Sequence, residues 1–132
     1  MDANQLISQA KSVIRIRENG DFTIGDVGCA LLTDKGNVYL GVCIDTSSSM
    51  GFCAEHNAIG SMVTAGESRI NKIVAVVEHE GGFYVLPPCG RCREFMYQID
   101  NNNIDTEVIL AADKSVLLKE LLPSYGWSVS RL

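Results

Sequence analysis

The chain has 132 residues, which is enough for one domain with a single core and too few for two. Hydrophobic residues make up 46% of it and charged residues 20%, a globular balance, and no apolar run approaches the roughly 20 residues of a membrane-spanning helix. The net charge is −5 and the basic residues are scattered, which argues against a nucleic acid partner. We therefore expect residues 1–132 to form one soluble domain.

The amino-terminal segment predicts a helix and contains no export signal. Residues 1–5 lack the basic start and the apolar stretch of a secretory signal, so the cytoplasm is the expected location. Apolar residues recur largely at helical spacing over residues 3–18, and Asn19-Gly20 offers a stop. This pattern is typical of an amphipathic helix that covers a sheet.

The next segment predicts a β-hairpin followed by a helix. Residues 27–32 and 38–44 are apolar runs of strand length, and the polar residues 33–37 between them include a glycine where a hairpin needs one. A short polar loop then leads to a helix predicted over residues 53–65, which Gly66 ends.

The second half of the chain continues the alternation. Residues 70–77 are a nearly unbroken β-branched run, typical of a strand buried on both faces. Pro88 predicts the start of another helix, because the first turn does not need the N–H that proline lacks. A strand over residues 106–112 and a short helix over 115–122 follow. Strands alternating with helices imply an α/β fold in which helices flank a central sheet.

Two motifs in this chain carry chemistry. The first is Cys53-Ala54-Glu55, and the second is Pro88-Cys89-Gly90-Arg91-Cys92. Cys89 and Cys92 are three positions apart, so their sulfurs can reach one ion from a single helical turn, and Cys53 can join them from another helix. Five cysteines in a chain expected in a reducing compartment favour metal binding or catalysis over a disulfide framework.

These motifs resemble the zinc-dependent deaminases of nucleobases and nucleosides, which carry [His/Cys]-x-Glu followed by Pro-Cys-x-x-Cys. With cysteine in first place, the chain is similar to the small cytidine deaminases and blasticidin S deaminases over about residues 27–99. The resemblance implies a three-layer α/β/α fold with a mixed five-stranded sheet and a homotetramer. It also implies a Zn²⁺ ion held by Cys53, Cys89 and Cys92, with Glu55 as the catalytic acid and base.

The implied enzyme is a zinc-dependent hydrolase that acts on the C–N bond of a cyclic amidine. It would convert a cytidine or deoxycytidine-type nucleoside to the uridine counterpart and ammonia, a reaction of pyrimidine salvage. An alternative substrate is a cytosine nucleoside antibiotic of the blasticidin S type, or a modified cytosine. A non-enzyme alternative is a structural zinc protein, whose fourth ligand would be one of the remaining histidines or cysteines, His56, His79, Cys29 or Cys43. A thioredoxin-like redox pair would leave the first motif unexplained.

The chain departs from the tetrameric cytidine deaminases where those enzymes bind ribose. Their strand before the loop usually ends in Asn-[Ile/Val]-Glu, and the matching residues here are Cys43-Ile44-Asp45. A phenylalanine that they commonly place two residues before a Val-Gly-Ala segment is Gly25 here. Blasticidin S deaminases also lack that asparagine and that phenylalanine. We expect substrate contacts from Cys43, Asp45 and Tyr125.

Two further features bear on the site. His56 stands where the tetrameric enzymes often have an arginine that supports a ligand sulfur, and a histidine can do so through one N–H. The aromatic residues Phe52, Tyr125 and Trp127 are candidates for stacking on a pyrimidine ring, since aromatic side chains near the carboxyl terminus do so in relatives.

Overall fold

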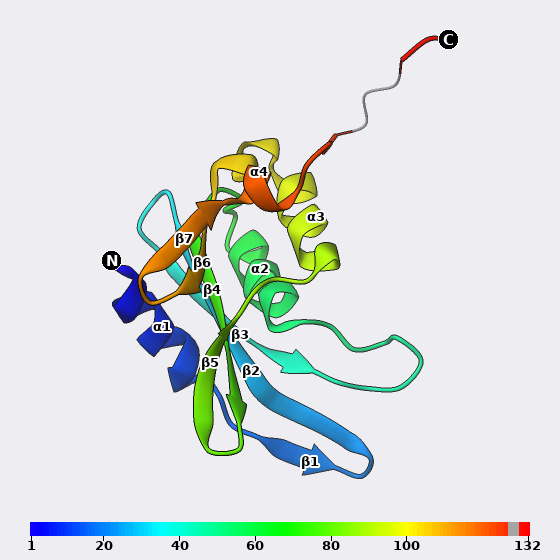
Figure 1. The fold of residues 1–132 in the computed structure, drawn as a ribbon. Coiled ribbons are helices and arrows are strands. Elements are labelled where there is room, and N and C mark those ends of the chain that lie inside the picture. The colour runs from blue at the N-terminus through cyan, green and yellow to red at the C-terminus, as the bar shows by residue number, and fades with distance from the viewer. Residues whose placement is uncertain (127–129) are drawn as a thin grey trace.

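The computed structural model describes residues 1–126 and 130–132, and these form three layers (Figure 1). A mixed β-sheet lies in the middle, with α1 on one face and the other α-helices on the opposite face. The five central strands pair in the order β3 (Val38–Ile44), β2 (Phe22–Thr33), β4 (Ile70–His79), β6 (Glu107–Ala111) and β7 (Lys114–Leu117). The β4–β6 pair is parallel and the other pairs are antiparallel. The predicted α/β class and mixed sheet are confirmed.

Two short strands extend the sheet to seven. Strand β1 (Arg17–Asn19) pairs with the start of β2, and β5 (Gly82–Leu86) pairs with the end of β4. Both partners are long strands whose ends reach past the central pairing. Their backbone N–H and C=O groups need hydrogen-bond partners there, and the short strands supply them. The predicted sheet of five strands therefore gains two more at its extended ends.

Helix α1 (Ala3–Ser12) covers one face of the sheet. Asp2 caps the helix, because its side chain accepts the backbone N–H of Gln5 at 2.8 Å. Leu6 and Ala10 are fully buried and pack against apolar residues of β2, β4 and β6. Burial of this stripe, rather than helix propensity, accounts for most of the stability of so short a helix.

The opposite face carries α2 (Ala54–Thr64) and α3 (Gly90–Ile99), followed by the short helices η1 (Asn101–Asp105) and α4 (Leu118–Leu121). Helix α2 lies close to β3 because Gly41 has no side chain, and a Cβ there would overlap the backbone of Ala54 and Ala58. The Asn57 amide also donates to the Val42 carbonyl at 3.1 Å. Among the described residues, no helix has the length and apolar character needed to cross a membrane.

Several predicted boundaries are wrong, and one of them is the start of β2, which lies at Phe22 instead of residue 27. The first helix ends at Ser12 instead of residue 18, and residues 17–19 form β1. The β-branched residues that follow Ser12 favour extended backbone, and the Arg15 N–H donates to the Gly25 carbonyl at 3.0 Å. Residues 115–117 belong to β7, and only residues 118–121 are helical. The third helix begins at Gly90, two residues after Pro88, with Cys89 as its N-cap.

Candidate metal centre and active site

The two cysteine motifs meet at the N-termini of α2 and α3. Cys53 is the N-cap of α2, Cys89 is the N-cap of α3, and Cys92 lies in the first turn of α3. The Sγ atoms of Cys53 and Cys89 are 3.7 Å apart, those of Cys89 and Cys92 are 3.5 Å apart, and the third pair lies within 4.8 Å. A tetrahedral zinc ion with Zn–S bonds of about 2.3 Å spaces its sulfurs about 3.8 Å apart. The three thiols therefore fit such an ion.

His56 lies beside these sulfurs. Its Nδ1 is 3.4 Å from the Sγ of Cys92, and one of its ring nitrogens lies within 4.8 Å of the Sγ of Cys53. Its ring stacks on that of Phe95, with centroids 4.4 Å apart. Of the four residues considered as a fourth ligand, His56 alone belongs to this group in the described part of the chain. The other three lie in the core (Cys29), at the wall of the pocket described below (Cys43) or at the exposed end of β4 (His79).

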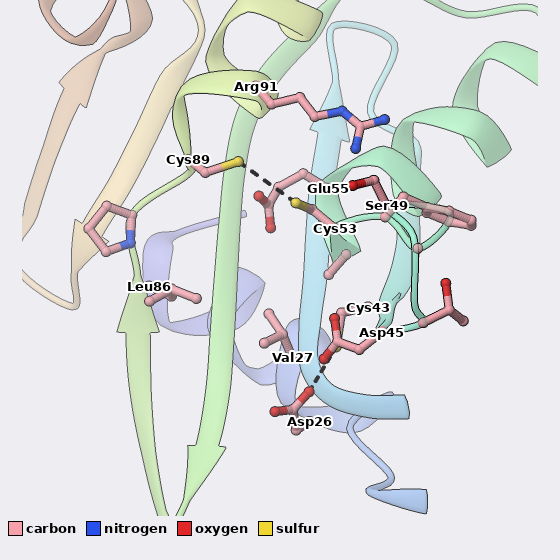
Figure 2. A pocket seen from close by; sticks show the side chains of 15 residues that line it. Asp26, Val27, Cys43, Asp45, Ser49, Cys53, Glu55, Leu86, Cys89 and Arg91 are labelled. Atoms are coloured by element: carbon pink, nitrogen blue, oxygen red, sulfur yellow. Dashed lines mark hydrogen bonds between the residues drawn. The ribbon is translucent and has the colours of Figure 1, made fainter. Parts of the chain in front are cut away.

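Glu55 follows Cys53 in the first turn of α2, and its carboxyl group is buried beside the sulfurs. Only 5% of the residue is exposed, and it lines the pocket next to Cys53 and Cys89 (Figure 2). Burial raises the pKa of this carboxyl group, and a hydrogen bond with Cys92 partly opposes that shift. A buried carboxyl group that faces a pocket is suited to accepting protons and donating them.

The thiols differ in acidity because their surroundings differ. Burial raises the pKa of the Cys53 thiol, and burial together with the nearby Glu55 raises that of Cys92. Burial acts on Cys89 in the same direction, but hydrogen bonds with the backbone and side chain of Cys92 bring its pKa below the usual value. Three sulfurs so close to a carboxyl group favour a bound cation, which stabilises thiolates.

Cys53, Cys89 and Glu55 form one end of a pocket of about 480 Å³. The opposite end is formed by Asp26 of β2 and by Cys43 and Asp45, at the end of β3 and just after it (Figure 2). We call these three residues the acidic wall. The Cys43 thiol donates to Oδ1 of Asp26 at 2.8 Å. Burial, and then this hydrogen bond, raise the pKa of the Cys43 thiol to about 11.

Only some of the residues predicted to contact the substrate line the pocket. Cys43 and Asp45 line the pocket, and so does Phe52. Tyr125 does not line it, because its ring packs against Tyr97 with centroids 5.2 Å apart, and its contact with substrate stays a prediction. Trp127 lies outside the described residues.

The sequence patterns do not single out several residues of the pocket lining, among them Asp26 and Leu86. Asp26 was left out because the strand was predicted to begin at residue 27, although a charged residue beside an apolar run was a visible signal. Leu86 was left out because β5 was not predicted. The signal for β5 was the apolar and aromatic run that follows Gly81-Gly82, which is the usual sequence of a hairpin return.

Comparisons with known proteins agree with this geometry. Residues 2–108 match the family model of the cytidine and deoxycytidylate deaminase zinc-binding region. A cytidine deaminase of Halalkalibacterium halodurans is 32% identical over 130 residues, which cover 93% of this chain and 92% of that protein. A blasticidin-S deaminase of Bacillus cereus is 37% identical over 76 residues, 53% of this chain and 54% of that protein.

A comparison with a solved structure supports the same family assignment. The crystal structure of cytidine deaminase from Mycobacterium tuberculosis superposes with a TM-score of 0.77 at 27% identity, over 96% of this chain and 99% of that one. The family model covers both cysteine motifs, and the superposition covers nearly the whole fold. The chain therefore belongs to the cytidine deaminase family, whose members are hydrolytic enzymes with a zinc-binding region.

Proposed function

We propose that this chain catalyses the hydrolytic deamination of a cytosine nucleoside, with cytidine and deoxycytidine as the first candidates. The observation that carries the proposal is the buried carboxyl group of Glu55 beside three sulfurs at zinc-like spacing, at one end of a pocket. A structural zinc site closes its coordination with four protein ligands and has no use for such a carboxyl group. In this proposal Cys53, Cys89 and Cys92 hold the zinc ion.

Glu55 would move the protons of the reaction. When bound, the zinc ion lowers the pKa of a water molecule and so supplies a nucleophile near neutral pH. Glu55 takes one proton from the attacking water and delivers it to N3 of the cytosine ring. It then delivers the second proton to the exocyclic amine. A C4–O bond forms and the C4–N bond breaks, so that water and the cytosine nucleoside give the uracil nucleoside and ammonia.

The acidic wall would face the sugar. With the ring amine at the sulfurs, the sugar of a nucleoside extends toward the opposite end of the pocket, where Asp45 can accept hydrogen bonds from hydroxyl groups. The thiol of Cys43 donates its hydrogen bond to Asp26, so it orients that carboxylate and has no donor left for the substrate. This set of groups differs from the Asn and Glu pair of the tetrameric cytidine deaminases.

A second candidate substrate is a cytosine nucleoside antibiotic of the blasticidin S type. The favouring observation is Gly25, which has φ of +85° and whose Cβ would overlap the Arg15 carbonyl. A phenylalanine cannot occupy this position without a change of backbone, so the sugar end is built differently from that of the tetrameric enzymes. The similarity to a blasticidin-S deaminase of Bacillus cereus points the same way.

An ammonia-release screen tests the proposal. The zinc-loaded protein is incubated with cytidine, deoxycytidine, cytosine, blasticidin S and N4-substituted cytidines, and ammonia and the loss of cytosine absorbance are measured. We expect turnover of at least one cytosine nucleoside. The relative kcat/KM values then rank the two candidates. Absence of ammonia from every compound, with zinc bound, would refute the function.

We also propose that the chain acts in the cytoplasm as a homotetramer in which neighbours complete each pocket. The five cysteines are all free, as a reducing compartment requires. Strand β5 presents exposed apolar side chains, among them Tyr84, 58% exposed, and Leu86, 42% exposed. Leu86 also lines the pocket, so a neighbour that covers β5 would cover one side of the pocket as well.

A further inference from the structure

Cys89 and Cys92 form a pair of thiols at the start of α3 in which one member is exposed and the other is buried. Cys89 is the N-cap of the helix and lines the pocket, whereas Cys92 lies in the first turn and is fully buried. Their Sγ atoms are 3.5 Å apart. The two residues between them, Gly90 and Arg91, are exposed, and no atom lies within 4 Å of the position that a Cβ of Gly90 would take. A small reagent in the solvent can therefore reach Cys89, while Cys92 is shielded from it.

A thiol pair of this kind can be oxidised by a hydroperoxide in two steps. The sulfur of Cys89 attacks the O–O bond of hydrogen peroxide and becomes a sulfenic acid, and the second oxygen leaves as water with the thiol proton. The thiol of Cys92 then attacks the sulfur of Cys89, so that an S–S bond forms, the S–O bond breaks and another water molecule leaves. The two sulfurs together lose two electrons, which reduce the peroxide to water.

Cys92 is better placed than Cys53 to complete this reaction. Cys53 is nearly as close to Cys89, at 3.7 Å between the sulfurs, but it lies on a different helix. An S–S bond is about 2.05 Å long, so either pairing must draw its sulfurs together by about 1.5 Å. Helix α2 packs on β3, and α3 is anchored by the Arg93 guanidinium, which donates to two backbone carbonyls at 2.8 and 3.1 Å. Pairing across the helices would move these anchored elements, whereas Cys89 and Cys92 share one turn and need only side-chain rotation.

We propose that Cys89 and Cys92 form a redox switch that controls zinc loading. In the metal-free chain a hydroperoxide closes the pair into a disulfide, and a dithiol reductant opens it again by exchange. The disulfide removes two of the three proposed zinc ligands, because the thiolate is the form of cysteine that binds a metal. Bound zinc in turn holds both sulfurs and protects them from oxidation. This inference rests on the proposed function for the zinc ligand set, and it adds regulation of the same site.

The test exposes the full chain, metal-free and zinc-loaded, to hydrogen peroxide and then counts free thiols after denaturation. The metal-free chain should lose two of its five thiols. Its mass should fall by about 2 Da, and peptide mapping should find Cys89 joined to Cys92. The oxidised chain should bind no zinc until dithiothreitol is added. The zinc-loaded chain should keep all five thiols at the same dose. Circular dichroism verifies that the metal-free chain is folded at the temperature of the test.

Three variants check the role of each thiol. Cys53→Ser removes the competing partner and should still lose two thiols and give the same cross-link. Cys53→Ser combined with Cys92→Ser leaves Cys89 without a partner, so a 1,3-dione probe should label its sulfenic acid. Cys89→Ser is the matched control, and it should lose no thiol because the exposed member of the pair is gone. The native chain alone decides the pairing, so the outcome does not depend on the folding of any variant.

The readouts of this test separate the inference from the proposed function, since none of them needs turnover. Five intact thiols in the treated metal-free chain, or a cross-link of Cys53 with Cys89, would overturn the inference. Oxidation of the zinc-loaded chain as fast as the metal-free chain would do so too. Ammonia release without disulfide formation would refute the switch and leave the deaminase function standing. A reversible disulfide of Cys89 with Cys92 that blocks zinc binding, with no ammonia from any cytosine nucleoside, would support the switch and refute the function.

Discussion

The imidazole ring of His56 lies flat on the phenyl ring of Phe95, with centroids 4.4 Å apart and planes 5° apart. This stacking sets the direction of the Nδ1 atom, which is 3.4 Å from the sulfur of Cys92. His56 comes from α2 and its two partners come from α3, so the stack also ties together the two helices that carry the cysteines. The aromatic partner thus fixes the orientation of a group that contacts a proposed zinc ligand.

We predict that His56 positions Cys92 and is not itself a zinc ligand. His56→Ala should keep one zinc ion per chain and lower kcat by about 10 to 100-fold, the usual effect of removing a group that supports a ligand. Phe95→Leu should lower kcat by a smaller factor, because the imidazole ring of His56 keeps its N–H but loses the aromatic ring that orients it. Metal analysis and steady-state kinetics check both variants.

The control for this prediction is His79→Ala, which removes the exposed histidine at the end of β4. It should change neither zinc content nor kcat. Loss of zinc from His56→Ala, with Cys92 still present, would contradict a supporting role and favour a closed site with four protein ligands.

We predict that Glu55→Gln retains zinc and loses nearly all turnover. Glutamine keeps the shape of the side chain but cannot shuttle protons, and the loss of a positioned acid and base costs typically 10² to 10⁴-fold in rate. The measurement pairs ammonia release with zinc content. Glu18→Gln, at an exposed position in β1, is the matched control and should behave as the native chain. Native turnover by Glu55→Gln would refute the assigned role.

Zinc removal should destabilise the fold. Three thiols from two helices would share one ion, and ligands that bind only the folded state stabilise it by about 2.7 kcal/mol at a hundredfold excess over Kd. We expect a chelator to lower Tm by on the order of 10 °C. Cys89→Ser should lower Tm by itself and make it insensitive to chelator. Cys43→Ser, at the acidic wall, should still bind zinc, and a full chelator effect in Cys89→Ser would contradict the proposed ligand set.

Much of the fold was predictable because the chain's strongest patterns are local. The hairpin of β2 and β3, helix α2 and strand β4 agree with apolar periodicity and turn residues. The segment after Ser12 was mispredicted because its apolar residues fit helical spacing, while the contact of Arg15 with Gly25 across the chain favours extended backbone. Strand β7 was mispredicted because its pairing with β6 is a tertiary effect.

The candidate site, like the fold, was predictable from the sequence only where local patterns determine it. The cysteine motifs predicted that Cys53, Cys89 and Cys92 would meet, since their spacing and helix starts are sequence properties. The contact of His56 with Phe95 depends on how α2 packs against α3, which no local pattern encodes. The inclusion of Asp26 in the pocket depends on an irregularity in strand pairing. Such long-range geometry decides which side chains line the end of the pocket opposite the sulfurs.

We predict that the assembly depends on the exposed side chains of β5. Sedimentation velocity of the native chain should give a species of about four times the 14.3 kDa chain mass. Tyr84→Lys places a charge on an apolar, 58% exposed position and should yield smaller species. If neighbours complete the pockets, kcat/KM should fall in parallel. A native monomer at all concentrations would contradict the homotetramer.

The loop after α2 contains a carboxyl group whose ionisation should set the acid stability of the chain. Oε2 of Glu67 accepts hydrogen bonds from the Tyr39 hydroxyl at 2.6 Å and from the Asn37 amide at 2.9 Å, and the residue is buried. The hydrogen bond from Tyr39 is the main reason that the pKa of Glu67 lies below its usual value. The same bond raises the pKa of Tyr39.

The sign of the pH dependence follows from these shifts. A carboxyl group with a depressed pKa in the folded state contributes stability that is present in full above its unfolded pKa, about 4.3 for glutamate. That contribution is lost as pH falls through the folded pKa. Tyr39 acts at the other end, since its raised pKa contributes stability below about pH 10 that is lost as pH rises through the folded value.

Urea unfolding of the native chain and of Glu67→Gln at pH 7, 5 and 3 checks this prediction. Glu67→Gln should be less stable than the native chain at pH 7, because the neutral amide accepts a weaker hydrogen bond from Tyr39 than the carboxylate does. The difference in unfolding free energy should shrink below pH 4, where the carboxylate of the native chain takes up a proton and resembles the amide. Tyr39→Phe, which removes the donor, should show a similarly reduced acid dependence. A difference that stays constant from pH 7 to pH 3 would show that Glu67 acts through packing and not through its charge.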